Sequence, residues 1–130
     1  MAPGEQIWVI DNALSLTLLF NTGCAFGILP GNAVVLSIIA VVSIVLILVA
    51  SRKLEKSARA ARVALGLIMG GALGNLVDRL RFSCVVDFID FQVWPVFNVA
   101  DSGVTAGVVL LLWYWLSGLK HEGKPGGTRS

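Results

Sequence analysis

Two aspartates in the middle of the chain could together carry out acid–base chemistry. Asp87 follows the apolar pair Val85-Val86, and Asp101 follows Asn98 by three residues at the start of a long apolar segment. A carboxyl group that is partly withdrawn from water has a raised pKa, and two facing carboxyls can share one proton. The ionised member of such a pair can take a proton from water while the protonated member polarises a carbonyl group. The two positions therefore predict a hydrolytic pair that needs no nucleophilic side chain.

Other aspartates lie in the same stretch and have simpler interpretations. Asp78 is part of a helical run, and Asn75 could satisfy it, which favours a structural role. Asp90 has bulky apolar neighbours and no evident partner, so a solvated loop position is the simpler interpretation. Asp101 itself could be a helix N-cap, although Ser102 could serve equally. Spacing alone leaves these alternatives open.

The composition indicates a protein of the lipid bilayer. Of the 130 residues, 56% are hydrophobic and 14% are charged, whereas soluble domains are about half apolar and a quarter charged. The net charge of +2 is too small to indicate a nucleic-acid partner, and no basic segment is interleaved with aromatic residues. Neither a CxxC motif nor a Cys/His cluster is present, so we expect no metal site and no cofactor. Cys24 and Cys84 could pair, but their small or apolar neighbours favour plain packing.

The chain divides into a short region of mixed polar and apolar residues and three long apolar segments. The segments 33–50, 63–80 and 102–119 each approach the length that a helix needs to cross a hydrocarbon core. Before them, a turn signal at Asp11-Asn12 separates a short apolar stretch from an alternating one, which predicts a β hairpin at the membrane surface within residues 1–32. The expected fold is an all-α polytopic membrane protein, a single domain over 1–130, with a small extracytoplasmic β platform near the N-terminus.

The second apolar segment carries features of a packed helix. Gly71, Asn75 and Asp78 fall at i, i+4 and i+7, so they share one helical face, which we expect to contact protein rather than lipid. Small residues also recur and would let another helix approach closely: Gly66, Gly70, Gly71 and Gly74.

Basic residues predict the orientation of the segments. Residues 51–62 carry five Lys or Arg against one Glu, and the tail 120–130 is also basic. The positive-inside rule places both in the cytoplasm, with Trp113 to Trp115 as an interfacial belt before the tail. The aspartates then lie at the extracytoplasmic edge. Because residues 1–32 hold no signal peptide to carry them across, we expect that a preceding transmembrane segment is absent from this sequence.

Two other classes of function use the same residues. A small ion or proton conductor could use the carboxylates as relays, but it would need acidic groups deep inside the segments, and here they cluster at one edge. The chain could also be a non-catalytic remnant left by loss of the preceding segment.

Four ordered blocks of the sequence resemble one family, the lipoprotein signal peptidases, also called signal peptidase II, which are membrane aspartyl proteases of bacteria. The blocks are FNTGCAFGI (20–28), GGALGNLVDRL (70–80), VVDFIDF (85–91) and WPVFNVADS (94–102). Any one block would be a weak match, whereas four in order at compatible spacings are specific. The chain departs from the family in two ways: the first of the family's four helices, with its Asp and Lys, is absent, and Ser83 stands where the family usually has Gly.

The resemblance implies roles for individual residues. Asp87 and Asp101 would be the catalytic dyad of an aspartic endopeptidase, and Asp78 would be structural, beside Arg79. The residues that would line or support the substrate site are Asn21, Gly71, Asn75, Arg79 and Asn98.

The resemblance also implies a substrate and a location. The substrate would be a diacylglyceryl-modified prolipoprotein, whose signal peptide is cut just before the lipid-bearing cysteine. The enzyme would be a multi-pass protein of the bacterial cytoplasmic (inner) membrane, in contact with membrane lipid. We expect a monomer.

Overall fold

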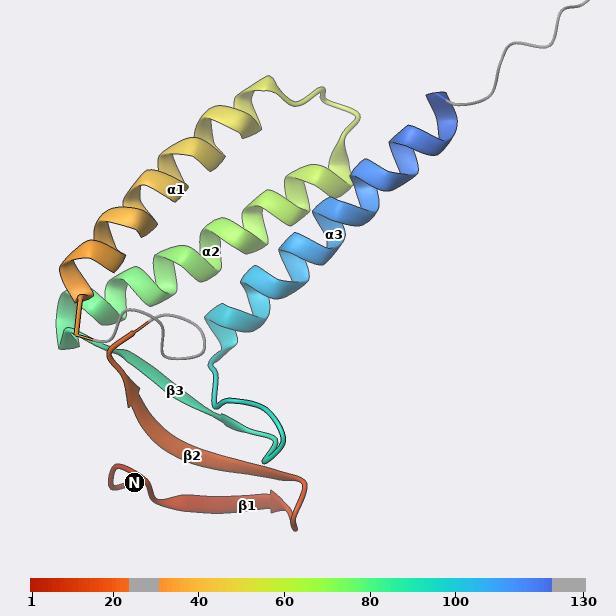
Figure 1. Ribbon diagram of the computed structural model, residues 1–130. Coiled ribbons are helices and arrows are strands. Elements are labelled where there is room, and N and C mark those ends of the chain that lie inside the picture. Colours follow the sequence, from red (N-terminus) through yellow and green to blue (C-terminus); the bar gives the residue numbers. More distant parts are fainter. Residues whose placement is uncertain (24–30, 123–130) are drawn as a thin grey trace, which may run out of the picture.

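Three long helices form the larger part of the molecule. The computed structural model describes residues 1–23 and 31–122, with side chains as far as Gly118. The helices are α1 (Ala33–Lys53), α2 (Arg59–Phe82) and α3 (Val99–Glu122), and Figure 1 shows them on one side of a small sheet. Each contains a stretch long and apolar enough to cross a bilayer. The expected polytopic membrane fold with a small β platform is therefore confirmed.

The helices extend beyond the apolar segments that the sequence predicts. Helix α1 continues to Lys53, α2 begins at Arg59 rather than at 63, and α3 begins at Val99 rather than at 102. At the end of α1 and the start of α2, hydropathy falls where charged residues begin, but Arg and Lys are good helix formers, so the helical hydrogen bonding continues through them. The connection between α1 and α2 is closed by Arg62, whose guanidinium donates to the Glu55 carbonyl oxygen at 2.8 Å.

Helices α2 and α3 pack at very close range. A Cβ atom added to Gly71 would collide with the Ala100 carbonyl oxygen and would lie 2.5 Å from Val104 Cγ2. A Cβ added to Gly107 would lie 2.6 Å from the Ala64 carbonyl oxygen. The two backbones can approach this closely only because these positions have no side chain.

The glycines predicted to line a helix contact do not all do so. Gly71 and, more loosely, Gly74 face α3, since a Cβ on Gly74 would lie 3.2 Å from the Ala100 Cβ. At Gly66 and Gly70 an added Cβ would meet nothing within 4 Å, so the prediction of close approach is wrong for these two. A glycine supports close packing only on the side of the helix that meets its neighbour, and composition does not reveal that side.

The sheet has three antiparallel strands in the order β1 (Gln6–Ile10), β2 (Leu14–Asn21) and β3 (Val85–Asp90). The predicted hairpin is confirmed, with Asn12 at φ 58° in its turn, a left-handed conformation that Asn tolerates. Strand β3 was not predicted. It pairs with β2 in a register that places Leu19 opposite Asp87 and thereby joins the N-terminal hairpin to the segment between α2 and α3.

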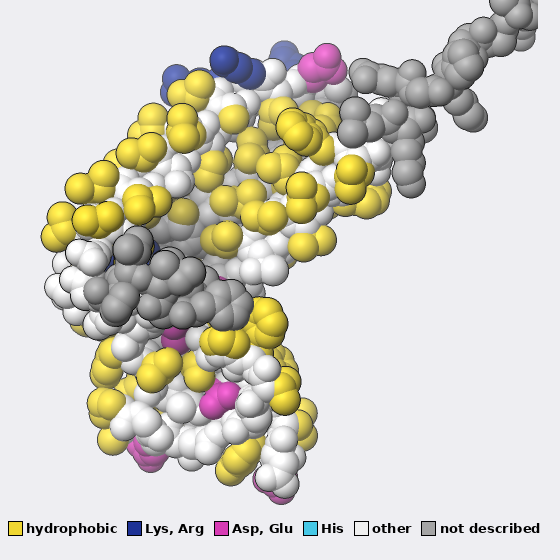
Figure 2. All heavy atoms as spheres, in the orientation of Figure 1, with side chains coloured by type: hydrophobic (Ala, Val, Ile, Leu, Met, Phe, Trp, Pro, Cys, Tyr) yellow, Lys and Arg dark blue, Asp and Glu magenta, His cyan; other side chains and the backbone are white. Residues whose placement is uncertain are grey.

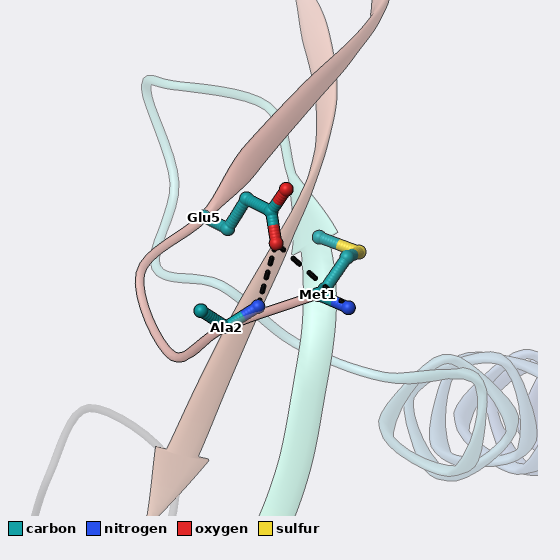
Figure 3. Close-up of polar contacts among 3 residues, drawn as sticks. All are labelled: Met1, Ala2 and Glu5. Carbon is teal, nitrogen blue, oxygen red and sulfur yellow. Dashed lines mark hydrogen bonds and ion pairs between the residues drawn. The ribbon is translucent and has the colours of Figure 1, made fainter.

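The residues before β1 fold back along the sheet. The Gly4 N–H donates to the Leu18 carbonyl oxygen at 2.8 Å. The Glu5 carboxylate accepts a hydrogen bond from the Ala2 N–H at 2.6 Å and lies 3.8 Å from the Met1 amino group (Figure 3). These contacts hold the start of the hairpin against β2.

Apolar side chains cover the outside of the helices. Figure 2 shows hydrophobic side chains spread over the helical part of the visible face, with Lys and Arg gathered at the end away from the sheet. In α1 only Leu36 is buried. An apolar surface of this extent is unfavourable in water and suits the hydrocarbon core of a bilayer.

Two predictions involve residues that the structure leaves undescribed. Cys84 is a buried free thiol, and Cys24 lies outside the described residues. The predicted tail 120–130 begins inside α3, which continues to Glu122, and its remaining residues lie outside the described part.

Candidate active site

Asp87 is the most deeply buried charged residue among those described. It lies in the middle of β3, and 1% of its surface is exposed. Each carboxylate oxygen accepts one amide hydrogen bond: Oδ1 from Asn98 Nδ2 at 3.0 Å and Oδ2 from Asn21 Nδ2 at 3.1 Å. A buried carboxyl is tolerated when its oxygens are satisfied, and these two amides satisfy them.

Asp101 is held at the start of α3 by a reciprocal cap. The Asn98 side-chain oxygen accepts the Asp101 backbone N–H at 2.9 Å, and Asp101 Oδ2 accepts the Asn98 backbone N–H at 3.1 Å. This is the geometry of a capping box, with Asn98 as the N-cap and Asp101 three residues later. The alternative in which Asp101 or Ser102 is the N-cap is therefore wrong, because the helix begins at Val99, earlier than hydropathy indicates.

Asn98 connects the two carboxylates. Its side-chain amide donates to Asp87, while its backbone N–H donates to Asp101. Asn75 on α2 completes the cluster, since its Nδ2 donates to Asp101 Oδ1 at 2.9 Å and its oxygen accepts from Asn98 Nδ2 at 3.0 Å. Residues from β2, α2, β3 and the start of α3 thus converge on one buried hydrogen-bonded cluster.

The environment of Asp87 favours its protonated form. Burial, which penalises the charged carboxylate, is the main cause that raises the pKa of Asp87 to about 6. The hydrogen bond from Asn21 opposes this rise, the negative charge of Asp101 adds to it, and the hydrogen bond from Asn98 opposes it again. The carboxyl can therefore hold or release a proton near neutral pH, as an acid–base catalyst must.

Asp78 contacts the backbone beside Asp87. Its Oδ2 accepts the Val86 N–H at 3.1 Å. The expectation that Asn75 would satisfy Asp78 is wrong, because Asn75 turns toward Asp101 and Asn98 instead. The shared face of α2 nevertheless contacts protein throughout, as predicted.

Asp90 is not a solvated loop residue, contrary to the sequence interpretation. It ends β3, is half-buried, and accepts hydrogen bonds from the Thr17 hydroxyl at 2.9 Å and from the Gln92 N–H at 2.8 Å. The partner that the sequence did not reveal comes from β2, which lies beside β3 only in the folded chain.

A cavity of about 1020 Å³ opens beside the two carboxylates. Its polar lining includes Asn21, Asp87 and Asp101, and most of the remaining lining is apolar. The apolar side is formed by residues that the sequence did not identify as functional: Leu19 and Phe20 of β2, and Phe91, Trp94, Pro95, Val96 and Phe97 between β3 and α3. Isolated aromatic residues in a membrane protein resemble an interfacial belt, so the sequence holds no clear signal for this wall.

The remaining predicted site residues lie outside the cavity lining. Gly71 and Asn75 stand behind it, where they set the distance between α2 and α3 and hold Asp101. Arg79 is half-buried near the end of α2, and its guanidinium makes no hydrogen bond or ion pair with the part of the chain that the structure describes. Its role in the site stays a prediction.

A family model described as signal peptidase (SPase) II matches residues 1–117. The chain belongs to this family. It is thus a membrane protease, built from three long helices and a small antiparallel sheet.

Individual relatives agree with this assignment. A lipoprotein signal peptidase of Pelotomaculum thermopropionicum is 44% identical over 117 residues, covering 90% of this chain and 77% of that protein. One of Moorella thermoacetica is 43% identical over 122 residues, covering 94% and 81%. A solved bacterial membrane enzyme superposes with a TM-score of 0.90 at 33% identity, covering 99% of this chain and 80% of that one.

Proposed function

We propose that this protein is an aspartic endopeptidase that removes signal peptides from diacylglyceryl-modified prolipoproteins, with Asp87 and Asp101 as its catalytic dyad. One observation carries the proposal: a single residue, Asn98, donates hydrogen bonds to both carboxylates at the wall of a largely apolar cavity. The names of the relatives, lipoprotein signal peptidases, supply the substrate class.

The two carboxyls take different parts in hydrolysis. Asp87, whose pKa burial raises to about 6, donates its proton toward the scissile carbonyl oxygen in its protonated form. Asp101 accepts a proton from water, whose oxygen bonds to the carbonyl carbon. Collapse of the tetrahedral intermediate breaks the C–N bond, returns one proton to Asp87 and passes the proton on Asp101 to the leaving amine. Both carboxyls end in their starting states, so the cycle needs no cofactor.

The asparagines keep the two carboxyls in distinct environments. Asp101 accepts one hydrogen bond at each carboxylate oxygen, from the Asn75 amide and from the Asn98 backbone N–H. Asn21 and the Asn98 side chain donate to Asp87 and limit how far burial raises its pKa. Asn21, Asn75 and Asn98 therefore support the dyad, and Gly71 supports it by allowing α3 to approach α2.

The distribution of charge supports a location for the site. The sheet lies at one end of the helices and the connection between α1 and α2 lies at the other (Figure 1). That connection and the two helix ends that flank it, residues 51–62, carry an excess of Lys and Arg, which favours the cytoplasmic side of a bacterial inner membrane. The dyad then acts at the extracytoplasmic edge, and α3 runs back toward a cytoplasmic C-terminus.

The test is cleavage of a synthetic precursor peptide that bears a diacylglyceryl cysteine. Asp87→Asn and Asp101→Asn should each lower the cleavage rate by at least about 10²-fold, because each removes one proton-transfer group. Asp11→Asn, at the exposed hairpin turn, is the matched control and should cleave at the rate of the unaltered protein. Cleavage that persists in either dyad variant, in protein that is folded and inserted, would exclude the proposed dyad.

A further inference from the structure

The apolar side of the cavity is formed largely by one loop, residues 91–97, which we call the wall segment. Five of its seven residues line the cavity: Phe91, Trp94, Pro95, Val96 and Phe97. The segment contains no regular strand or helix pairing of its own except the bridge at Phe97. Contacts at both of its ends help to fix its position.

The end of the wall segment next to α3 is fixed by backbone and ring contacts. The Phe97 N–H donates to the Ile89 carbonyl oxygen at 3.1 Å, and the Phe97 carbonyl oxygen accepts from the Ile89 N–H at 2.8 Å. The Phe91 and Phe97 rings stack with their centroids 5.9 Å apart. The backbone hydrogen bonds join this end of the wall segment to β3.

The other end is fixed by Gln92. This residue has φ 67°, a left-handed conformation that is strained for a non-glycine residue. Two hydrogen bonds hold it there: its N–H donates to Asp90 Oδ1 at 2.8 Å, and its side-chain Nε2 donates to Ser15 Oγ at 3.0 Å. A strained conformation persists only where the surroundings fix it, so these two bonds determine how the wall segment leaves β3.

The acceptor of the Gln92 side chain is itself firmly placed. Ser15 on β2 is fully buried, at 0% exposure. Its hydroxyl also receives a hydrogen bond from Gln6 Nε2 on β1 at 2.8 Å and lies 3.2 Å from the Thr17 hydroxyl, which in turn donates to Asp90. This network spans all three strands, and none of its hydrogen bonds involves Asp87 or Asp101.

We propose that Gln92, through Ser15, is a positioning residue that sets the apolar wall of the cavity and thereby the affinity for the apolar part of the lipidated precursor. The inference rests on the proposed function. A wall of three aromatic rings with Pro and Val offers dispersion and apolar burial rather than hydrogen bonds, so it recognises hydrocarbon. Because the wall does not touch the transferred protons, its displacement weakens binding of substrate and transition state equally.

The test compares two glutamines that donate to the same hydroxyl. Gln92→Ala frees the wall segment, and we expect KM for the diacylglyceryl precursor peptide to rise about fivefold, the equivalent of one lost hydrogen bond, with kcat within about twofold. Gln6→Ala removes the other donor to Ser15, on β1, away from the wall, and should raise KM less than Gln92→Ala does. Ser15→Ala removes the shared acceptor with little change of volume and should raise KM as Gln92→Ala does.

Two further outcomes separate this inference from the proposed function. Gln92→Gly removes the strain of the left-handed backbone and, like Gln92→Ala, removes the side-chain amide that donates to Ser15. If KM rises in both variants to the same extent, the effect comes from the lost side chain and not from backbone strain. An unchanged KM in both Gln92→Ala and Ser15→Ala overturns the positioning role, as does a fall in kcat with KM unchanged. If Asp87→Asn is inactive in the same assay, the proposed function stands whichever result the Gln92 variants give.

Discussion

Substitution of Gly71 by Ala tests whether the spacing of α2 and α3 holds the dyad together. The added Cβ would collide with the Ala100 carbonyl oxygen, a main-chain atom that cannot rotate away, and would lie 2.5 Å from Val104 Cγ2. Ordinary contact begins at 3.4 Å, so the helices must separate locally. Ala100 immediately precedes Asp101, and Asn75 lies one turn after Gly71. Separation of the helices here would therefore lengthen the hydrogen bond between Asn75 and Asp101, which is 2.9 Å long.

The expected effect follows from the size of the displacement. The two helices must move apart by about 1 Å, and a misplacement of about 1 Å in a catalytic site can lower the rate about 10²-fold. This corresponds to about 2.7 kcal/mol of transition-state stabilisation. The free energy of unfolding should fall as well, by about 1–3 kcal/mol, as overpacking does in other close-packed interiors.

Two glycine variants provide controls for this prediction. Gly70→Ala adds the same methyl group to the neighbouring residue, where nothing lies within 4 Å, and should keep kcat/KM within about twofold. Gly107→Ala produces a comparable clash with Ala64 further along α3 and should reduce stability more than activity. The assay is kcat/KM on a diacylglyceryl precursor peptide, with thermal unfolding measured in the same detergent or vesicle. Cleavage by Gly71→Ala at the rate of the Gly70→Ala variant would refute the idea that this contact positions the dyad.

Four further results are expected. In a pH profile, kcat/KM should fall as the pH rises through about 6, because burial raises the pKa of Asp87 to that value and the proposed acid is lost when it ionises. Asn21→Ala removes a donor that lowers this pKa, so the same decline should move to higher pH; a decline that stays in place would contradict the role of Asn21. Asp78→Asn keeps an acceptor for the Val86 N–H but removes a negative charge that raises the pKa of Asp87, so the decline should move to lower pH, and a shift upward would count against the electrostatic account. Ser83→Gly should raise the free energy of unfolding by about 1 kcal/mol, measured by thermal or chemical unfolding, because Ser83 ends α2 at φ 57°, where glycine has no strain; an unchanged or lower stability would show that the strain is relieved in some other way.

The C-terminal end of α2 is capped by Ser83 in a left-handed conformation. A glycine at this position would take the left-handed conformation that commonly ends a helix without steric conflict. Ser83 adopts that conformation, and its N–H donates to the Arg79 carbonyl oxygen at 2.9 Å. The cap is thus formed with a residue less suited to it.

Much of the framework could be predicted because it depends on local patterns. The hairpin follows from the short apolar stretch before Asp11-Asn12 and the alternating one after it, and the three helices follow from apolar runs of bilayer length. The boundaries were less accurate, since Val99 and Arg59 lie beyond the apolar runs but within the helices. The third strand had a usable local signal, the β-branched and aromatic residues of Val85 to Ile89 before a turn at Gln92, which could have predicted it.

By itself, the sequence determined which residues had chemistry to offer: aspartates concentrated between apolar segments, and, through its likeness to a family, Asp87 with Asp101. Only the tertiary structure decided how they are held. Asn98 joins the two carboxylates because β3 and the first turn of α3 meet there, and Asn75 reaches Asp101 rather than Asp78 because α2 lies against α3. A local pattern encodes the period of an element and the side that avoids water. The partner of a buried polar group depends on which distant segments fold against it, and no local pattern contains that information.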